Sequence, residues 1–182
     1  MEDLSLHILD ISENSIDAGA GRIEIRIIES ESANRLTLEI RDDGRGMDEE
    51  TLMKIRDPFF TTKSVRRFGL GIPLLAQAAE ECSGAFSADS APGRGTVITA
   101  SFQRDHIDRK PLGDMGATMM ALVGSHPELH FVFTYQRETS GETGTFTFDS
   151  RAFAALLDGI PLTLPDVLQL IRNSINVSLK GE

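Results

Sequence analysis

Alternating apolar and polar positions divide the chain into strands and helices. Period-two alternation predicts half-buried strands, whereas apolar residues spaced three or four apart predict amphipathic helices. The expected strands are residues 22–29, 35–41, 85–90, 96–102, 130–136 and 144–148. The expected helices are residues 6–20, 74–82, 113–123, 150–157 and 164–179, and a short helix begins at Asp48.

The order of these elements indicates an α+β fold with two parts. Up to residue 103 the order is helix, two strands, loops with a helix, and two more strands. It predicts a two-layer α/β sandwich over a mostly antiparallel sheet. A polar, charged stretch then starts at residue 103, which favours a boundary between 1–103 and a small α/β C-terminal extension, 104–182. An extension of this size is marginal as an independent core, so we expect it to dock on the first part or to pair with a second copy.

The first helix carries a line of polar residues on an otherwise apolar surface. At about 100° per residue, His7, Asp10, Asn14 and Asp17 fall within an arc of roughly 80°. A helix that is apolar nearly all round is buried, so this line should face something polar inside the fold. The alternative is that the line meets solvent. A carboxylate one turn from an amide oxygen suits a pocket for a magnesium nucleotide.

Several loop motifs follow this helix. In Asp42-Asp43-Gly44-Arg45-Gly46, a carboxylate at a strand end can accept a hydrogen bond from an adenine amino group. Gly69-Leu70-Gly71, at a helix start, can present backbone N–H groups to a phosphate. Taken singly, residues 42–46 also fit an ordinary turn, residues 93–96 also fit a hairpin turn, and residues 58–63 also fit a loop that fills the core. Basic residues stand just before the second glycine motif, at Lys63, Arg66 and Arg67.

Taken together, these motifs resemble the Bergerat-type ATP-binding fold that sensor histidine kinases, DNA gyrase and the mismatch-repair protein MutL share. The resemblance covers about residues 3–103 and includes the Asn14 helix, DxGxG, PFFTTK at 58–63, GLG at 69–71 and GRGT at 93–96. It implies a histidine-kinase-like ATPase domain with ATP and Mg²⁺ as cofactors.

The resemblance also implies roles for individual residues. Asn14 would ligate Mg²⁺, and Asp42 would bind the adenine amino group with support from Thr96. Asp10 stands where the ATPase branch of the superfamily places its catalytic glutamate, and is the candidate catalytic residue. The remaining expected nucleotide-binding residues are Asp17, Gly44, Gly46, Met47, Lys63, Arg67, Phe68, Gly69, Leu70 and Gly71.

Composition narrows the class of protein. The formal net charge of −10 argues against sequence-independent binding to nucleic acid or anionic lipid, which needs clustered Lys and Arg. No apolar run is long enough to span a membrane, and the acidic start does not read as a secretion signal. The single cysteine, Cys82, is expected to be a packed residue and fits a reducing cytoplasm.

Three functions remain open. The chain is a kinase catalytic domain that phosphorylates or regulates a separate protein partner, as the anti-sigma serine kinases of the superfamily do. Alternatively it is a nucleotide-switched binding module with little turnover, or a MutL- or gyrase-like ATPase. His106, His126 and His130 lie in unrelated contexts and are expected to be structural or surface residues rather than phosphoacceptors. The extension is expected to serve the protein partner or a homo-oligomer.

Overall fold

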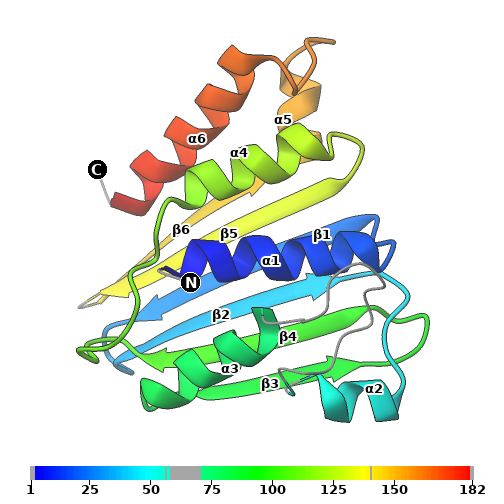
Figure 1. Ribbon diagram of the computed structural model, residues 1–182. Coiled ribbons are helices and arrows are strands. Elements are labelled where there is room, and N and C mark those ends of the chain that lie inside the picture. The colour runs from blue at the N-terminus through cyan, green and yellow to red at the C-terminus, as the bar shows by residue number, and fades with distance from the viewer. Residues whose placement is uncertain (1–2, 56, 58–70, 140, 181–182) are drawn as a thin grey trace.

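A single six-stranded sheet forms the centre of the computed structural model, which describes residues 3–55, 57, 71–139 and 141–180. The strand order is β3-β4-β2-β1-β5-β6 (Figure 1). The strands are β1 (Arg22–Ser30), β2 (Arg35–Asp42), β3 (Ala85–Ser90), β4 (Thr96–Gln103), β5 (His130–Thr139) and β6 (Glu142–Asp149). The helices are α1 (Leu4–Asp17), α2 (Glu49–Lys54), α3 (Gly71–Glu81), α4 (Met115–Ser125), α5 (Ser150–Leu156) and α6 (Pro165–Lys180). The predicted α+β sandwich is confirmed.

The C-terminal extension continues the sheet of the first part. β5 pairs with β1 in parallel, in the register Ile23 opposite Phe131. All other neighbouring strands pair antiparallel, including the β5–β6 hairpin. Of the two expectations for the extension, docking on the first part is therefore the one that this structure shows.

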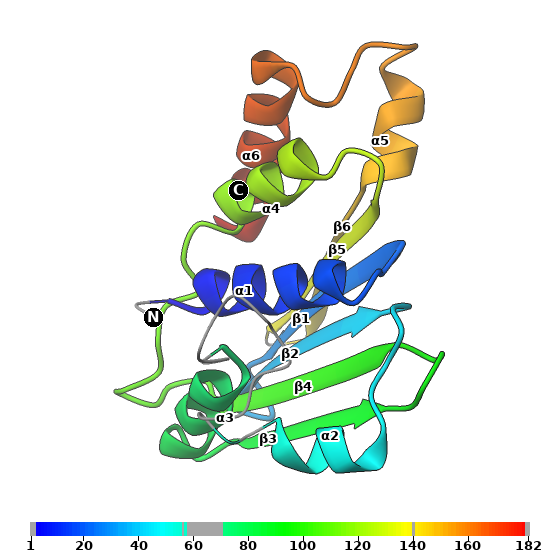
Figure 2. The ribbon, with the colours of Figure 1, turned by 45° about the vertical axis from the view of Figure 1, so that its right-hand side comes forward.

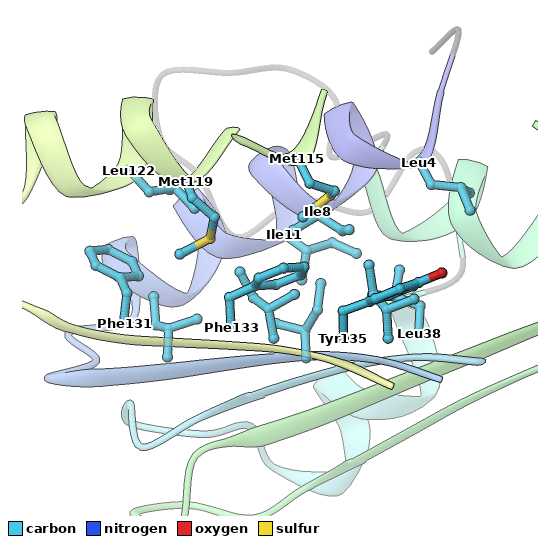
Figure 3. Close-up of a cluster of buried hydrophobic side chains, with 14 of the residues drawn as sticks. Leu4, Ile8, Ile11, Leu38, Met115, Met119, Leu122, Phe131, Phe133 and Tyr135 are labelled. Carbon is cyan, nitrogen blue, oxygen red and sulfur yellow. The ribbon is translucent and has the colours of Figure 1, made fainter. Parts of the chain in front are cut away.

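The core lies between the sheet and the helices that cover one of its faces, among them α1, α3 and α4 (Figures 1 and 2). Alternate strand residues such as Ile25, Leu38 and Phe133 point toward these helices and are buried. Figure 3 shows Met119 of α4 and Ile8 of α1 above the aromatic side chains of β5. Residues from both parts of the chain thus share one continuous hydrophobic core. Cys82 belongs to this core, as predicted.

The boundaries of α1 differ by a few residues from the expected stretch. The helix begins at Leu4 because the carboxylate of Asp3 accepts a hydrogen bond from the backbone N–H of Leu6. It ends at Asp17, and Gly19 then adopts a φ of 78° that turns the chain toward β1. The polar line of α1 lies inside these boundaries.

Side-chain hydrogen bonds connect the extension to the rest of the chain. The hydroxyl of Tyr135 in β5 donates to Glu29 Oε2 in β1 at 2.8 Å, and Arg104 Nε donates to Glu29 Oε1 at 2.7 Å. Within the extension, Arg172 of α6 forms an ion pair with Asp114, the N-cap of α4, at 2.7 Å. The extension is therefore fixed by specific polar contacts in addition to its share of the core.

Candidate nucleotide-binding site

Asp42 occupies the end of β2, where its carboxylate is 9% exposed. Oδ1 accepts hydrogen bonds from the backbone N–H groups of Gly44 at 2.9 Å and Thr96 at 3.2 Å. Oδ2 accepts one bond from the hydroxyl of Ser15, at 2.8 Å. A carboxylate oxygen has room for about two acceptor interactions, so Oδ2 keeps capacity for a further donor.

The loops around Asp42 fit tightly against each other. Gly46 has a φ of 68°, and a Cβ added there would overlap the carbonyl oxygen of Ala91. The hydroxyl of Ser90 accepts from the backbone N–H of Met47 at 2.9 Å and lies 3.0 Å from Thr96 Oγ1. Only glycine allows this backbone approach, which brings the DxGxG and GRGT motifs together beside Asp42.

The N-terminus of α3 meets α1 at Asp10. Gly71 is the first residue of α3, and a Cβ added to it would overlap the Asp10 carboxylate, with Cγ only 2.9 Å away. A helix N-terminus carries free N–H groups and the positive end of the helix dipole. The structure therefore places the candidate catalytic carboxylate next to a group that favours anions such as phosphate.

The rest of the polar line follows the same face of α1. Asn14 is partly buried one turn after Asp10, and Asp17 is exposed at the end of the helix. His7, one turn before Asp10, is fully buried. Loss of solvation lowers the pKa of His7 to about 4, so the imidazole is neutral at neutral pH. The alternative in which the whole line meets solvent does not hold at His7.

Five of the expected nucleotide-binding residues lie outside the described residues: Lys63, Arg67, Phe68, Gly69 and Leu70. The structure brings together Asp42, Gly44, Gly46, Met47 and Thr96 at one end of α1. Asp10 and Gly71 meet farther back along the same helix, beyond Asn14.

The described residues contain no group of three or more His, Cys, Asp or Glu side chains arranged to hold a metal ion. A cation near Asn14 would therefore need ligands from a nucleotide as well as from this part of the protein. None of the helices in the described ranges has both the length and the apolar character that a membrane crossing requires.

Comparison with known proteins decides the family. Residues 2–106 match the family model described as histidine kinase-, DNA gyrase B- and HSP90-like ATPase. The chain belongs to this ATPase family. The matched residues contain Asp42 with its surrounding loops and the Asp10–Gly71 contact, so both lie in a nucleotide-binding ATPase fold.

Curated relatives of this ATPase are sensor and sporulation kinases. A putative sensor protein of Shewanella frigidimarina is 33% identical over 97 residues, which are 52% of this chain and 15% of that protein. FleS, a sensor protein kinase of Pseudomonas aeruginosa, is 36% identical over 50% of this chain and 23% of its own length. Sporulation kinase C of Bacillus subtilis is 30% identical over 50% of this chain and 21% of its own length. The chain thus spans less than a quarter of each of these relatives, and the similarity supports an ATPase domain of the kinase type.

A solved structure resembles this chain in fold over more residues than the family model matches. The N-terminal domain of a DNA repair protein superposes with a TM-score of 0.56 at 14% identity, covering 81% of this chain and 53% of that one. Residues 2–106 alone are too few to supply this share of 182 residues, so part of the extension is included in the shared fold.

Two residues beside Asp42 were missed by the sequence analysis. Ser15 directly follows Asn14, but it points to the sheet side of α1, where it reaches Asp42. Ser90 links the two glycine loops from the end of β3. Each is a common small polar residue without a distinctive spacing, and only the strand register reveals its partners. His130, expected to be structural, lies 3.0 Å from the carboxylate of Asp149.

Proposed function

We propose that the chain is an ATP- and Mg²⁺-binding catalytic domain that transfers a phosphoryl group to a separate protein. The main support is the contact between the Asp10 carboxylate and the first residue of α3, on the same helix that contacts Asp42 through Ser15. Asp10 and Asn14 lie along α1, and Asp42 lies at the end of β2 beside Ser15, so the three side chains proposed as base, cation ligand and adenine partner follow one helix.

Asp42 is the proposed partner of the adenine ring. The spare acceptor capacity of Asp42 Oδ2 suits the exocyclic amino group of adenine, and burial of the carboxylate strengthens such a bond. A side chain at Gly44 would crowd the backbone of Ala18, and one at Gly46 would overlap the backbone of Ala91, so both glycines keep their loop close to Asp42. Thr96 would bind on the base side through its hydroxyl, which lies 3.0 Å from the hydroxyl of Ser90.

The part of the polar line of α1 near Asp10 would face the phosphates. The backbone N–H groups of Gly71 and Ile72, at the start of α3, would face the terminal phosphate, and Asn14 would contribute one ligand to Mg²⁺. Bound ATP supplies the phosphoryl group, and Mg²⁺ neutralises part of its charge. Asp10 would accept the proton of the attacking group, which is a side chain of the protein partner in a kinase or water in an ATPase.

The extension supports the existence of a protein partner. Large apolar side chains are exposed over its last helices, with Leu156 82% exposed, and apolar surface of this kind favours protein contacts. The others are Ile160, Leu164, Leu170 and Val177. We propose that this surface holds the protein that receives the phosphoryl group, and self-association through the same surface is the alternative.

The proposal is tested by following the fate of the γ-phosphate. The full chain is incubated with Mg²⁺ and γ-labelled ATP, with and without a cell lysate, and labelled protein and released phosphate are both measured. A kinase labels a partner, and the label disappears with Asp10→Asn. Release of phosphate without labelled protein would favour the ATPase alternative. ATP binding with neither product would favour the nucleotide-switched module, and absence of ATP binding by calorimetry would contradict all three.

A matched surface variant separates catalysis from partner binding. Leu156→Ser removes the most exposed of these apolar side chains and should leave ATP affinity unchanged while it lowers partner labelling. Exposed Ile107, at 94%, lies in the loop before α4 and is the control site. If Ile107→Ser lowers labelling as much as Leu156→Ser, the surface formed by the last helices is not the partner site.

A further inference from the structure

His7 is a buried polar residue without a polar partner. Its side chain is 0% exposed, and neither ring nitrogen has a hydrogen-bond partner among the residues that the structure describes. Buried polar groups in folded proteins are nearly always paired, because an unpaired one loses its bonds to water without replacement. An apolar side chain of the same size would therefore suit a purely structural role better. Such exceptions tend to occur at functional sites.

The position of His7 points to the ATP site. It lies three residues before Asp10 on the same face of α1, and helical residues three apart are neighbours. The backbone of Gly71 lies near the ring of His7, in a contact that by itself raises the pKa of His7 but falls short of hydrogen-bond geometry. The same glycine is in contact with the Asp10 carboxylate. His7 and Asp10 therefore both face the first residue of α3.

Burial and the nearby charge of Lys110, and not the contact with Gly71, determine the charge state of His7. Burial is the largest influence on the ring and lowers its pKa to about 4, so the ring carries no charge at neutral pH. A cation beside the N-terminus of α3 would be repelled by the positive end of the helix dipole. A neutral imidazole avoids this repulsion and still offers one donor and one acceptor nitrogen.

We propose that His7 is a positioning residue of the ATP site, whose buried imidazole holds the first turn of α3 where Gly71 meets Asp10. This inference rests on the proposed function, since it assigns the first turn of α3 to the terminal phosphate. ATP and ADP differ only in that phosphate. His7 should therefore affect the affinity for ATP much more than the affinity for ADP.

The test compares His7→Phe with His7→Gln. Phenylalanine keeps a planar ring of similar size and removes both nitrogens, whereas glutamine restores a donor and an acceptor. Dissociation constants for MgATP and MgADP are measured by calorimetry on the full chain, and thermal unfolding is followed in parallel. In His7→Phe we expect ATP affinity to fall by about tenfold, with ADP affinity unchanged. This is the scale of one hydrogen bond from a backbone N–H of α3 to the charged terminal phosphate. His7→Gln should recover part of the loss, and His7→Phe should melt at the wild-type temperature or above.

Ser12 provides the matched control. It is the other α1 residue among the described ranges that has a buried, unpartnered side-chain polar atom, and its position on the helix is about 140° from that of His7. Ser12→Ala should leave the ratio of ATP to ADP affinity unchanged. An unchanged ratio in folded His7→Phe would overturn the inference while leaving ATP binding intact. If His7→Phe does not fold, the ratio of ATP to ADP affinity is measured in His7→Gln and His7→Leu. An unchanged ratio in folded His7→Leu would then overturn the inference. Wild-type protein that binds neither nucleotide would remove the proposed function itself.

Discussion

Replacing Asp42 by Asn should weaken ATP binding and leave the fold in place. Oδ1 of Asp42 accepts from two backbone N–H groups, at Gly44 and Thr96, whereas Oδ2 accepts only from the Ser15 hydroxyl. The amide oxygen of asparagine must therefore take the place of Oδ1, because an NH₂ group there would face two donors. The NH₂ group then takes the place of Oδ2.

The fold tolerates this change because Ser15 has a second acceptor. Its hydroxyl oxygen lies 3.3 Å from the carbonyl oxygen of Ile11, so the hydroxyl can donate to that carbonyl and accept from the new amide. We expect a loss of about 1 kcal/mol in the free energy of unfolding, the worth of one exchanged hydrogen bond. In this variant the NH₂ group of asparagine would face the amino group of adenine, and two donors cannot form a hydrogen bond with each other. The loss of a charge-assisted bond corresponds to about 1.5–3 kcal/mol, or roughly 10- to 150-fold in affinity.

Calorimetry with ATP and inosine triphosphate provides the assay. Hypoxanthine carries a carbonyl group where adenine carries its amino group, so the asparagine NH₂ can donate to it. Asp42→Asn should therefore shift the preference from ATP toward inosine triphosphate. Ser15→Ala is the control, because it keeps the carboxylate and should keep the preference for ATP. Unchanged ATP affinity and an unchanged ratio of the two nucleotides in Asp42→Asn would refute the adenine assignment.

Four further changes have defined outcomes. Asp10→Asn should keep ATP affinity within about twofold, because it retains the contact with Gly71, but abolish phosphate transfer or release in the labelled-ATP assay. Mg²⁺ alone should show no binding by calorimetry, and its removal by chelation should weaken ATP binding, since Asn14 supplies only one protein ligand. Because the pKa of His7 falls from 6.5 to about 4 on folding, its contribution to stability is complete above pH 6.5 and declines toward pH 4, by up to about 3 kcal/mol. His7→Phe should therefore flatten the acid side of the urea-denaturation profile, and an unchanged profile would contradict this. Tyr135→Phe removes the hydrogen bond to Glu29 and should lower the free energy of unfolding by about 1–2 kcal/mol at neutral pH, whereas Thr134→Ser on the open face of β5 should not.

Much of the fold could be predicted because its elements have clear periodicity. The alternation in residues 22–29 and 96–102 gave strand boundaries within a residue of β1 and β4. The polar line on α1 indicated where that helix faces the site, and Asp42 was located from the end of its strand. These features depend on local sequence, which fixes the side of a helix or strand that each residue occupies.

The remaining features depend on pairing between distant segments. The parallel alignment of β5 with β1 has no local signal, because the alternation of a strand is the same whichever neighbour it takes. The contacts of Ser15 and Gly71 have the same origin. Each becomes visible only when β2 or α3 is placed beside α1.

The β1–β5 pairing also determines how this protein must fold during its synthesis. Ser30 and Glu138, which are paired across it, are 108 residues apart, so β1 leaves the ribosome long before its partner strand exists. At about 5–20 residues per second, the edge of β1 waits roughly 5–20 s for β5. During that interval the strand Arg22–Ser30, with its alternating isoleucines, is an unprotected sheet edge, the kind of surface that recruits other nascent chains. Slow translation between residues 104 and 130 should therefore lower the soluble yield, whereas chaperones that shield sheet edges should restore it.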